Sequence, residues 1–381
     1  MSKSVAYVHF PYWPDQARLE TMPFSLNSVL ALAKSGLTVD LYVCERDLSP
    51  YEGLLPANVN IRRLAPIDEE QQFEIQEIAL DAASIPAYLC AFGLGQIGIV
   101  LASRLAAHSR CPLVFLNDEF PSNTPPNVWA EREHEAARKV DVFIVSDASR
   151  ARALLDELGV AGKPVAVVPN VTNVKEWPSM DWHGRLGLPS GSKPFMYAGT
   201  LGDWAYVPAL ISTVPSWPAD AVMIVHSRSA SPGYDAQFSH LDIQGRVFWS
   251  LLPLPEPLLN SLTSYCTGTF ALYLNQGPNT ETMGFSSGKL MRSIACGTPV
   301  IASRYASLSY IEENKLGVLV EDPGEVPQAV MKVMASHDEY SQNCRQFHRT
   351  HLSFDHAWGE FCDLLAGRTG FRVPSAVETR R

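Results

Sequence analysis

The residues best suited to chemistry lie in one segment, residues 284–303, which reads Gly-Phe-Ser-Ser-Gly-Lys-Leu-Met-Arg-Ser-Ile-Ala-Cys-Gly-Thr-Pro-Val-Ile-Ala-Ser. Its small-residue turn leads into a helix predicted over 288–296, which Gly297 ends and Pro299 prevents from continuing. A helix start reached through such a turn offers free N–H groups and the positive end of the helix dipole, which suit a phosphate. The segment therefore predicts a phosphate-binding site.

Two cations in this helix bear on that interpretation. Lys289 lies in the first helical turn, where the dipole disfavours a positive charge unless an anion is bound. Arg292 follows three residues later and shares a helix face with Lys289. Its guanidinium can fork onto phosphate oxygens but cannot accept a hydrogen bond. Arg292 either contacts phosphate or faces solvent, and both interpretations stay open.

A second glycine turn, residues 199–202, follows a strand predicted over 195–198. Glycines at the end of a strand let the backbone approach a phosphate or a sugar closely. His226 ends another predicted strand, and Leu252 follows a third. These carboxyl ends are where open parallel sheets bind ligands.

A rival signal lies in the first half of the chain. Residues 93–98 read Gly-Leu-Gly-Gln-Ile-Gly between a predicted strand and a predicted helix, and Asp118 follows about twenty residues later. This is the dinucleotide-binding fingerprint, so an NAD-dependent oxidoreductase is an alternative. However, the fingerprint is not in the first strand–helix unit, and it leaves the segment at 284–303 unexplained.

Composition narrows the class of protein. The chain has 381 residues, 46% of them hydrophobic and 18% charged, which is typical of a globular protein with more than one domain. The net charge of −10 gives no basic footprint for a nucleic acid. Seven dispersed cysteines without a CxxC pair favour a reducing compartment over disulfides or a zinc site. No signal peptide or membrane-spanning run is recognisable, so we expect a cytoplasmic protein.

Strand and helix patterns alternate along the chain and restart after an irregular stretch, which predicts two α/β domains with parallel sheets and a ligand cleft between them. Among the less regular segments we expect a helix over 71–83 and a strand over 87–91. The predicted boundaries are an N-terminal Rossmann-like domain at 1–172, a linker at 173–193, a C-terminal Rossmann-like domain at 194–350, and a last helix with a loose tail at 351–381.

The wording of residues 295–303, Ala-Cys-Gly-Thr-Pro-Val-Ile-Ala-Ser, resembles the donor-site helix of GT-B glycosyltransferases, especially those of the retaining family 4. The resemblance covers residues 140–325 well and the N-terminal part in outline. It implies a GT-B fold in which two Rossmann-like domains face a central cleft. In that family this helix holds the diphosphate and the ribose of a nucleotide sugar.

The resemblance also implies roles for individual residues. The donor would be bound by Gly199, Thr200, Leu201, Gly202, His226, Leu252, Phe285, Ser286, Ser287, Gly288, Lys289 and Arg292. Catalytic roles fall to Asn117, Asp118 and Glu119, on the loop that contacts the transferred sugar in the family, and to Lys289. The acceptor side would comprise Tyr12, Trp13, Arg18, Gly93 and Gly95.

The chain departs from the family pattern at three places. Arg292 stands where the family usually has a glutamate that accepts hydrogen bonds from the ribose. The first acidic residue of the family motif is also displaced, since Glu281 lies three residues before Gly284. The Arg and Lys that commonly follow the first glycine turn are missing. Lys289 is therefore the expected substitute that neutralises the leaving diphosphate.

The resemblance implies a glycosyltransferase that acts in polysaccharide biosynthesis. It would transfer a sugar from a UDP- or GDP-sugar to a glycan or lipid-linked glycan, with retention and without a metal. Its partners would be the nucleotide sugar and the acceptor, and weak peripheral association with the inner face of the membrane is left open. The alternatives are a nucleotide-sugar epimerase of the same fold, an NAD-dependent oxidoreductase using Gly93–Gly98, and a catalytically inactive GT-B binding protein.

Overall fold

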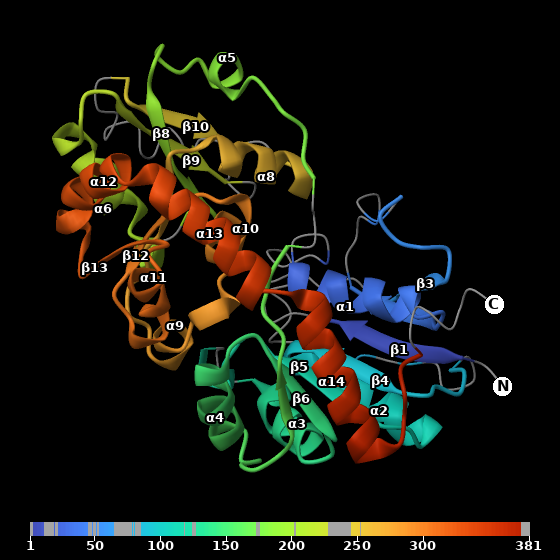
Figure 1. The fold of residues 1–381 in the computed structure, drawn as a ribbon. Coiled ribbons are helices and arrows are strands. Elements are labelled where there is room, and N and C mark those ends of the chain that lie inside the picture. The colour runs from blue at the N-terminus through green and yellow to red at the C-terminus, as the bar shows by residue number, and fades with distance from the viewer. Residues whose placement is uncertain are drawn as a thin grey trace. The chain divides into compact units, whose positions relative to one another are not determined.

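The structure is a computed structural model. It describes the chain apart from residues 1–2, 11–18, 20–21, 45–47, 49–50, 52, 65–77, 79, 81–84, 118, 124–126, 173–175, 202, 228–244, 252 and 375–381, and apart from the side chain of Asp203. The chain forms two compact units (Figure 1). The first unit comprises residues 1–170 and 354–381, and the second comprises residues 171–353.

The described strands of the first unit form one parallel sheet in the order β3-β2-β1-β4-β5-β6-β7. Consecutive apolar residues build β1 and β5 because both faces of the sheet are covered. The strands are β1 (Ser4–His9), β2 (Thr38–Val43), β3 (Val59–Arg63), β4 (Ala91–Leu94), β5 (Leu113–Asn117), β6 (Val142–Val145) and β7 (Val165–Val167). The α-helices are α1 (Pro23–Lys34), α2 (Gly95–Ser109), α3 (Val128–Ala137), α4 (Ala148–Glu157) and α14 (Phe354–Thr369).

Some expectations for the first unit need comment. The strand expected over 87–91 is wrong, because β4 begins at Ala91 and pairs with β1 and β5 from there. The helix expected over 71–83 falls almost entirely outside the described residues. The C-terminal helix α14 packs against β6 and β7, so the last helix belongs to the first unit.

The described strands of the second unit form a parallel sheet in the order β10-β9-β8-β11-β12-β13. Alternate residues of β8 enter two separate cores, Phe195 and Tyr197 on one face and Met196 on the other. The strands are β8 (Lys193–Ala198), β9 (Ala221–His226), β10 (Val247–Ser250), β11 (Gly268–Ala271), β12 (Val300–Ser303) and β13 (Gly317–Val320).

The α-helices of the second unit are α5 (Trp182–Leu186), α6 (Val207–Thr213), α8 (Glu256–Tyr265), α9 (Pro278–Glu281), α10 (Gly288–Cys296), α11 (Tyr310–Glu313), α12 (Val326–Ala335) and α13 (His337–His351). Helix α5 lies inside the stretch expected to be a linker, residues 173–193. Trp182 of α5 is buried in the second core, and its indole N–H donates to Ser261 Oγ at 2.9 Å. This part of the stretch is therefore packed structure.

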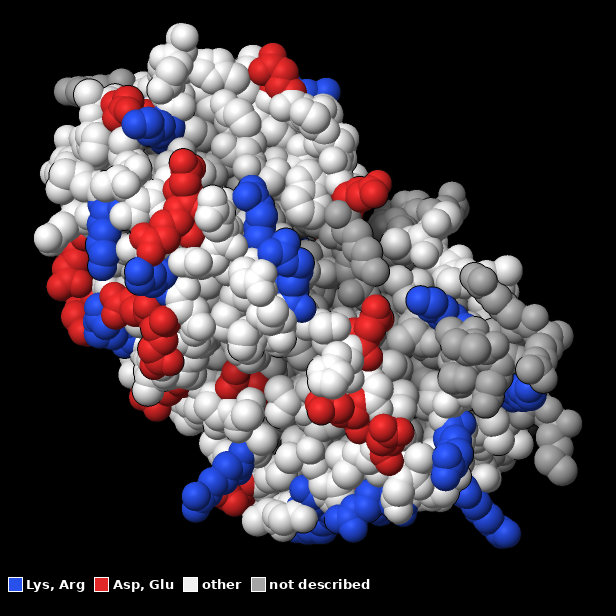
Figure 2. All heavy atoms as spheres, viewed as in Figure 1, with Lys and Arg blue, Asp and Glu red and all other residues white. Residues whose placement is uncertain are grey.

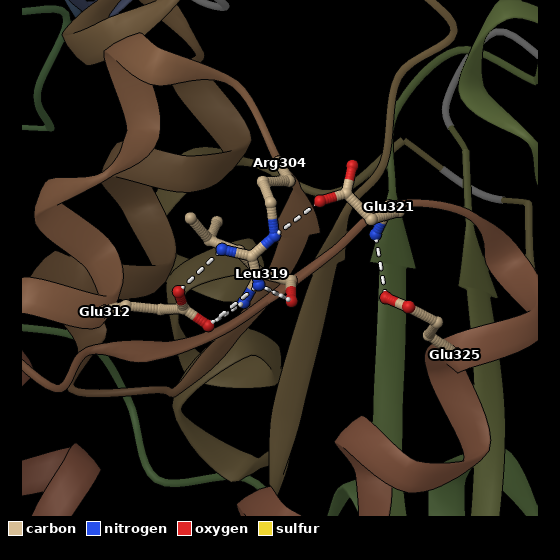
Figure 3. A network of polar contacts seen from close by, with 5 residues as sticks. All are labelled: Arg304, Glu312, Leu319, Glu321 and Glu325. Carbon is tan, nitrogen blue, oxygen red and sulfur yellow. Dashed lines mark hydrogen bonds and ion pairs between the residues drawn. The ribbon is translucent and has the colours of Figure 1, made fainter.

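Strand β13 forms one edge of the second sheet, and a charged network covers it (Figure 3). The Arg304 guanidinium donates to the Leu319 carbonyl at 2.9 Å, while the Leu319 N–H donates to Glu312 at 3.3 Å. Arg304 also pairs with Glu312 at 2.8 Å and with Glu321 at 2.9 Å. The outward backbone groups of Leu319 are thus occupied by side chains, which blocks strand addition at this position.

Candidate functional site

The second sheet has a topological switch point between β8 and β11. These strands are neighbours, but the chain continues from β8 to β9 on one side and from β11 to β12 on the other. In open α/β sheets ligands bind at the carboxyl ends of the strands at such a point. Gly199 directly follows the carboxyl end of β8, and Tyr273 lies two residues after the carboxyl end of β11.

Helix α10 begins beside this switch point, and its range agrees with the helix predicted from the sequence. Ser287 is the N-cap: its hydroxyl accepts the Leu290 N–H and bonds to Tyr273 Oη at 2.7 Å. Gly297 ends the helix in the left-handed conformation, with φ of 73°. The N–H groups of Gly288 and Lys289 have no intrahelical acceptor, as in any first helical turn. These groups are available to an anion.

Lys289 carries its ammonium into an aromatic box of three rings, which come from Tyr197, Trp204 and Tyr273. The Nζ atom lies 4.5 Å from the ring centre of Tyr197, 5.4 Å from that of Trp204 and 4.6 Å from that of Tyr273. It also lies 3.4 Å from Tyr197 Oη. Such distances are those of cation–π contacts.

The electrostatics of Lys289 are unusual for a lysine. Burial lowers its pKa to about 7, since the interior disfavours the charged form. Within the described part of the chain no carboxylate forms an ion pair with its ammonium. The ring faces replace only part of the solvation that the ammonium loses. A cation held without a counter-ion beside a helix N-terminus is well placed to meet an anion.

Gly199 brings the backbone against this ammonium. Its φ of +154° is a conformation that essentially only glycine adopts. A Cβ at this position would lie 3.3 Å from Lys289 Nζ and 3.3 Å from Tyr197 Oη. The glycine turn after β8 and the start of α10 therefore meet in space, although about ninety residues separate them in the sequence.

The neighbouring residues of the predicted donor site are anchored by hydrogen bonds. Gly199 N–H donates to the His226 carbonyl at 3.0 Å, and His226 Nδ1 bonds to Ser250 Oγ at 3.0 Å. The His226 side chain is buried. Tyr197 Oη donates to the Thr200 carbonyl at 2.5 Å, and Leu201 is buried in the core. The structure thus brings Gly199, Thr200 and His226 together with Lys289.

Arg292 is turned toward α8. Its Nε donates to Asn260 Oδ1 at 3.1 Å, and Asn260 is completely buried. Arg292 and Lys289 nevertheless line the same small pocket, between the sheet, α8 and α10. The pocket is also lined by Met196, Ala198, Thr263, Thr269, Phe270 and Ser293. With a volume of about 10 Å³ the pocket has room for about one water molecule, and its hydroxyl groups donate to other protein groups, so it is not itself a diphosphate site.

The remaining predicted donor residues differ in their surroundings. Phe285, in the short turn Gly284–Ser286, packs its ring on Tyr310 at 5.0 Å between centroids and so contributes to packing. Ser286 N–H donates to the Met283 carbonyl at 2.7 Å, which shapes the turn before the N-cap. Gly202 and Leu252 lie outside the described residues.

In the first unit, Asn117 ends β5 and is completely buried, and its Oδ1 accepts the Glu119 N–H at 2.7 Å. Glu119 is partly exposed. The third residue of this predicted catalytic group, Asp118, lies outside the described residues, as do Tyr12, Trp13 and Arg18.

The G-x-G-x-x-G segment has a structural explanation. A Cβ at Gly93 would lie 2.6 Å from Ile99 Cα and 2.9 Å from Ala102 Cβ, so this glycine lets α2 pack closely on β4. Gly95 starts α2 with a φ of +71°. The side chain of Gln96, also in this segment, donates to the buried Glu133 at 3.0 Å.

Three features of the described residues bear on other kinds of site. No cluster of three or more His, Cys, Asp or Glu side chains could hold a metal ion there. None of the described helices is both long and apolar enough to span a bilayer. On the face drawn in Figure 2, acidic and basic side chains are interspersed rather than gathered into one basic patch.

The patterns in the sequence do not single out the residues of the aromatic box. Tyr197 and Tyr273 belong to the ends of two strands whose adjacency is a matter of topology, and Trp204 reads as an ordinary packing residue. A usable signal exists, since aromatic residues stand at the carboxyl ends of two predicted strands.

No protein-family model and no curated protein sequence matches this chain. Among solved structures, HepE from Anabaena in complex with UDP and glucose is 14% identical, with a TM-score of 0.69 over 96% of this chain and 99% of that chain. Sucrose-phosphate synthase from Thermosynechococcus elongatus is 15% identical, with a TM-score of 0.69 over 96% and 98%. A proposed UDP-N-acetylglucosamine 2-epimerase from Listeria monocytogenes is 15% identical, with a TM-score of 0.60 over 96% and 97%. Together with the two parallel α/β sheets, this similarity shows that the chain has the predicted GT-B fold.

Proposed function

We propose that this chain is a glycosyltransferase similar to family 4, which transfers a hexose-type sugar from a UDP- or GDP-sugar to a glycan or lipid-linked glycan. One observation carries the proposal: the Lys289 ammonium, which has no carboxylate partner among the described residues, the glycine turn at Gly199 and the start of α10 meet at the switch point of the second sheet. HepE, which has a similar fold, was solved in complex with UDP, and this supports the proposal that the ligand is a nucleotide.

In this proposal the protein acts mainly on the leaving group. As the bond to the sugar breaks, negative charge develops on the diphosphate. The N–H groups of Gly288 and Lys289 and the Lys289 ammonium stabilise that charge from fixed positions, and Arg292, three residues further along α10, adds its positive charge. Because these groups supply positive charge themselves, the proposed reaction needs no metal. We also propose that the anomeric configuration is retained, and only the resemblance to family 4 supports this part.

The acceptor is assigned to the first unit. Asn117 ends β5 at the carboxyl edge of its sheet, where ligands of such sheets bind, and Glu119 follows two residues later. We assign them to the transferred sugar together with Asp118, and we assign Tyr12, Trp13, Arg18, Gly93 and Gly95 to the acceptor side. A role in polysaccharide biosynthesis, in the cytoplasm or at the inner face of the membrane, completes the proposal.

A nucleotide-sugar epimerase is the second candidate, and the similarity to the proposed epimerase from Listeria monocytogenes favours it. Both activities use the same diphosphate site, so binding alone does not separate them. An epimerase converts its nucleotide sugar without an acceptor, whereas a glycosyltransferase releases free nucleoside diphosphate when an acceptor is present.

Two measurements test the proposal in sequence. A thermal-shift panel with UDP, GDP, ADP, CMP and NAD should show that one nucleoside diphosphate raises the melting temperature, because a ligand that binds only the folded state stabilises it. The corresponding nucleotide sugars are then incubated with and without glycan acceptors, and the products are separated by chromatography. Stabilisation by NAD alone would replace the proposal with an oxidoreductase, and isomerisation without acceptor would replace it with an epimerase.

A further inference from the structure

The three rings of the aromatic box are fixed by contacts of their own. Trp204 and Tyr273 stack at 5.8 Å between centroids, with 16° between their planes. Tyr273 Oη bonds to the N-cap hydroxyl of Ser287 at 2.7 Å. Tyr197 Oη donates to the Thr200 carbonyl at 2.5 Å. The rings therefore form a preorganised frame between the start of α10 and the turn that follows β8.

The frame has the geometry of a cation-binding site. The Lys289 Nζ atom lies 4.5, 5.4 and 4.6 Å from the three ring centres, inside the range of about 6 Å over which cation–π attraction acts. The Tyr197 hydroxyl donates its proton to the Thr200 carbonyl, so its lone pairs are left to accept from Nζ, 3.4 Å away. Ring faces and a phenol oxygen both attract positive charge. The box therefore favours an ammonium group over a neutral one.

Rings suit a cation at this position better than a carboxylate would. Lys289 lies in the first turn of α10, where the helix dipole repels positive charge. A carboxylate would offset that repulsion, but it would also cancel the charge that a diphosphate has to meet. Neutral rings offset the repulsion and leave the positive charge in place. They hold the ammonium against the turn at Gly199, where a Cβ would lie 3.3 Å from Nζ.

We propose that Tyr197, Trp204 and Tyr273 form a binding site for a primary ammonium group, that Lys289 is its built-in occupant, and that this site places the positive charge which a diphosphate meets at the start of α10. The three aromatic residues are thus positioning residues that act through Lys289. The inference rests on the proposed function and adds to it the part of the protein that places the cation. It predicts that the box binds a free alkylammonium ion once the lysine side chain is removed.

Chemical rescue of Lys289→Ala tests this prediction, because n-propylammonium contains the atoms that the substitution removes. The full chain is titrated by calorimetry with UDP, or with GDP if the wild type binds only GDP, in n-propylammonium chloride at up to about 100 mM, since single cation–π sites are weak. Sodium chloride at the same concentration controls for ionic strength, and 1-propanol controls for the apolar chain. Lys289→Ala should bind the diphosphate about tenfold or more weakly than the wild type, and n-propylammonium should recover about fivefold relative to both controls.

Ring variants assign the rescue to the box. The rescue should be lost in Lys289→Ala/Trp204→Leu and kept in Lys289→Ala/Trp204→Phe, which retains a ring. With the lysine in place, Trp204→Leu should lower the affinity for the diphosphate about fivefold and leave that for its nucleoside unchanged, a split that a merely structural effect would not produce. Tyr273→Leu replaces Trp204→Leu if circular dichroism shows that the latter does not fold. Lys315→Ala is the matched control: this exposed lysine pairs with Glu339, so its loss should neither weaken diphosphate binding nor create a response to n-propylammonium.

Asp203 precedes Trp204, and its side chain lies outside the described residues. Asp203→Asn tests whether a carboxylate, rather than the rings, holds the ammonium, and we expect no loss of diphosphate affinity. If Asp203→Asn binds the diphosphate as weakly as Trp204→Leu, or if n-propylammonium restores Lys289→Ala no better than sodium chloride does, the inference is overturned and the proposed function stands. If neither UDP nor GDP binds to the folded wild type, both are overturned.

Discussion

Replacing Lys289 by methionine should change stability and ligand affinity in opposite directions. Methionine keeps the length of the side chain and its contacts with Tyr197 and Trp204 but removes the charge. The wild-type protein must place an ammonium among three rings without an anionic partner among the residues that the structure describes, which costs free energy. The variant avoids this cost in the free protein and forfeits the attraction to a diphosphate.

The pH dependence of the stability effect has a definite sign. The pKa of Lys289 is lowered in the folded protein to about 7, so between that pH and the ordinary pKa of lysine the unfolded chain binds more protons. Wild-type stability therefore rises with pH across this window. The advantage of Lys289→Met should be about 1–3 kcal/mol at pH 7 or below and should vanish near pH 10.5; the figure is discounted because part of the Lys289 side-chain surface remains accessible to solvent.

Affinity for the diphosphate should fall by about 1.5–3 kcal/mol, the range for a hydrogen bond to a charged group. That corresponds to a dissociation constant about 10- to 150-fold higher. Urea unfolding at pH 6.5, 8 and 10 and calorimetry at pH 7 measure the two effects. Lys315→Met, which removes an exposed lysine, should leave both unchanged within error. Lower stability together with wild-type affinity in Lys289→Met would refute this reasoning.

Three further predictions concern neighbouring features. Gly199→Ala should lower the free energy of unfolding by about 1–3 kcal/mol in urea titrations, because its φ of +154° and the 3.3 Å approach to Lys289 exclude a side chain; wild-type stability would contradict this. Glu312→Gln should cost about 1 kcal/mol at pH 7. Arg304 lowers the pKa of Glu312 below its ordinary value of 4.5. The difference in unfolding free energy between wild type and variant should therefore disappear as the pH falls through this lowered pKa. A difference that stays constant with pH would show that the ion pair is not its source. Arg292→Glu should weaken diphosphate binding at least tenfold at low salt, and equal or tighter binding would show that Arg292 does not face the phosphates.

Local patterns predicted the main elements of the second unit well. Helix α10 has the predicted bounds, and strand β8 ends at the predicted residue, because glycine and proline punctuate the chain around them. Helix α13 was not anticipated. It is polar along most of its length and buries a narrow stripe through Tyr340, Cys344 and Phe347, so the apolar signal is weak until the helix packs on α10.

The candidate site was predictable only in part. The start of α10 and Lys289 are visible in the sequence because turn chemistry and helix position are local properties. The aromatic box is not, since Tyr197 and Tyr273 become neighbours only because β8 pairs with β11 across a switch point. The direction of Arg292 was equally hidden, because it depends on the buried Asn260 of another helix.

The most direct test of a diphosphate site in the second unit is calorimetric titration of the wild type with UDP and GDP, each compared with its nucleoside. We predict that one diphosphate binds at least tenfold more tightly than its nucleoside, and that this advantage is lost in Lys289→Met, because the selectivity comes from the cation and the start of α10. Equal binding of diphosphate and nucleoside, or selectivity that survives in Lys289→Met, would contradict the assignment of this site.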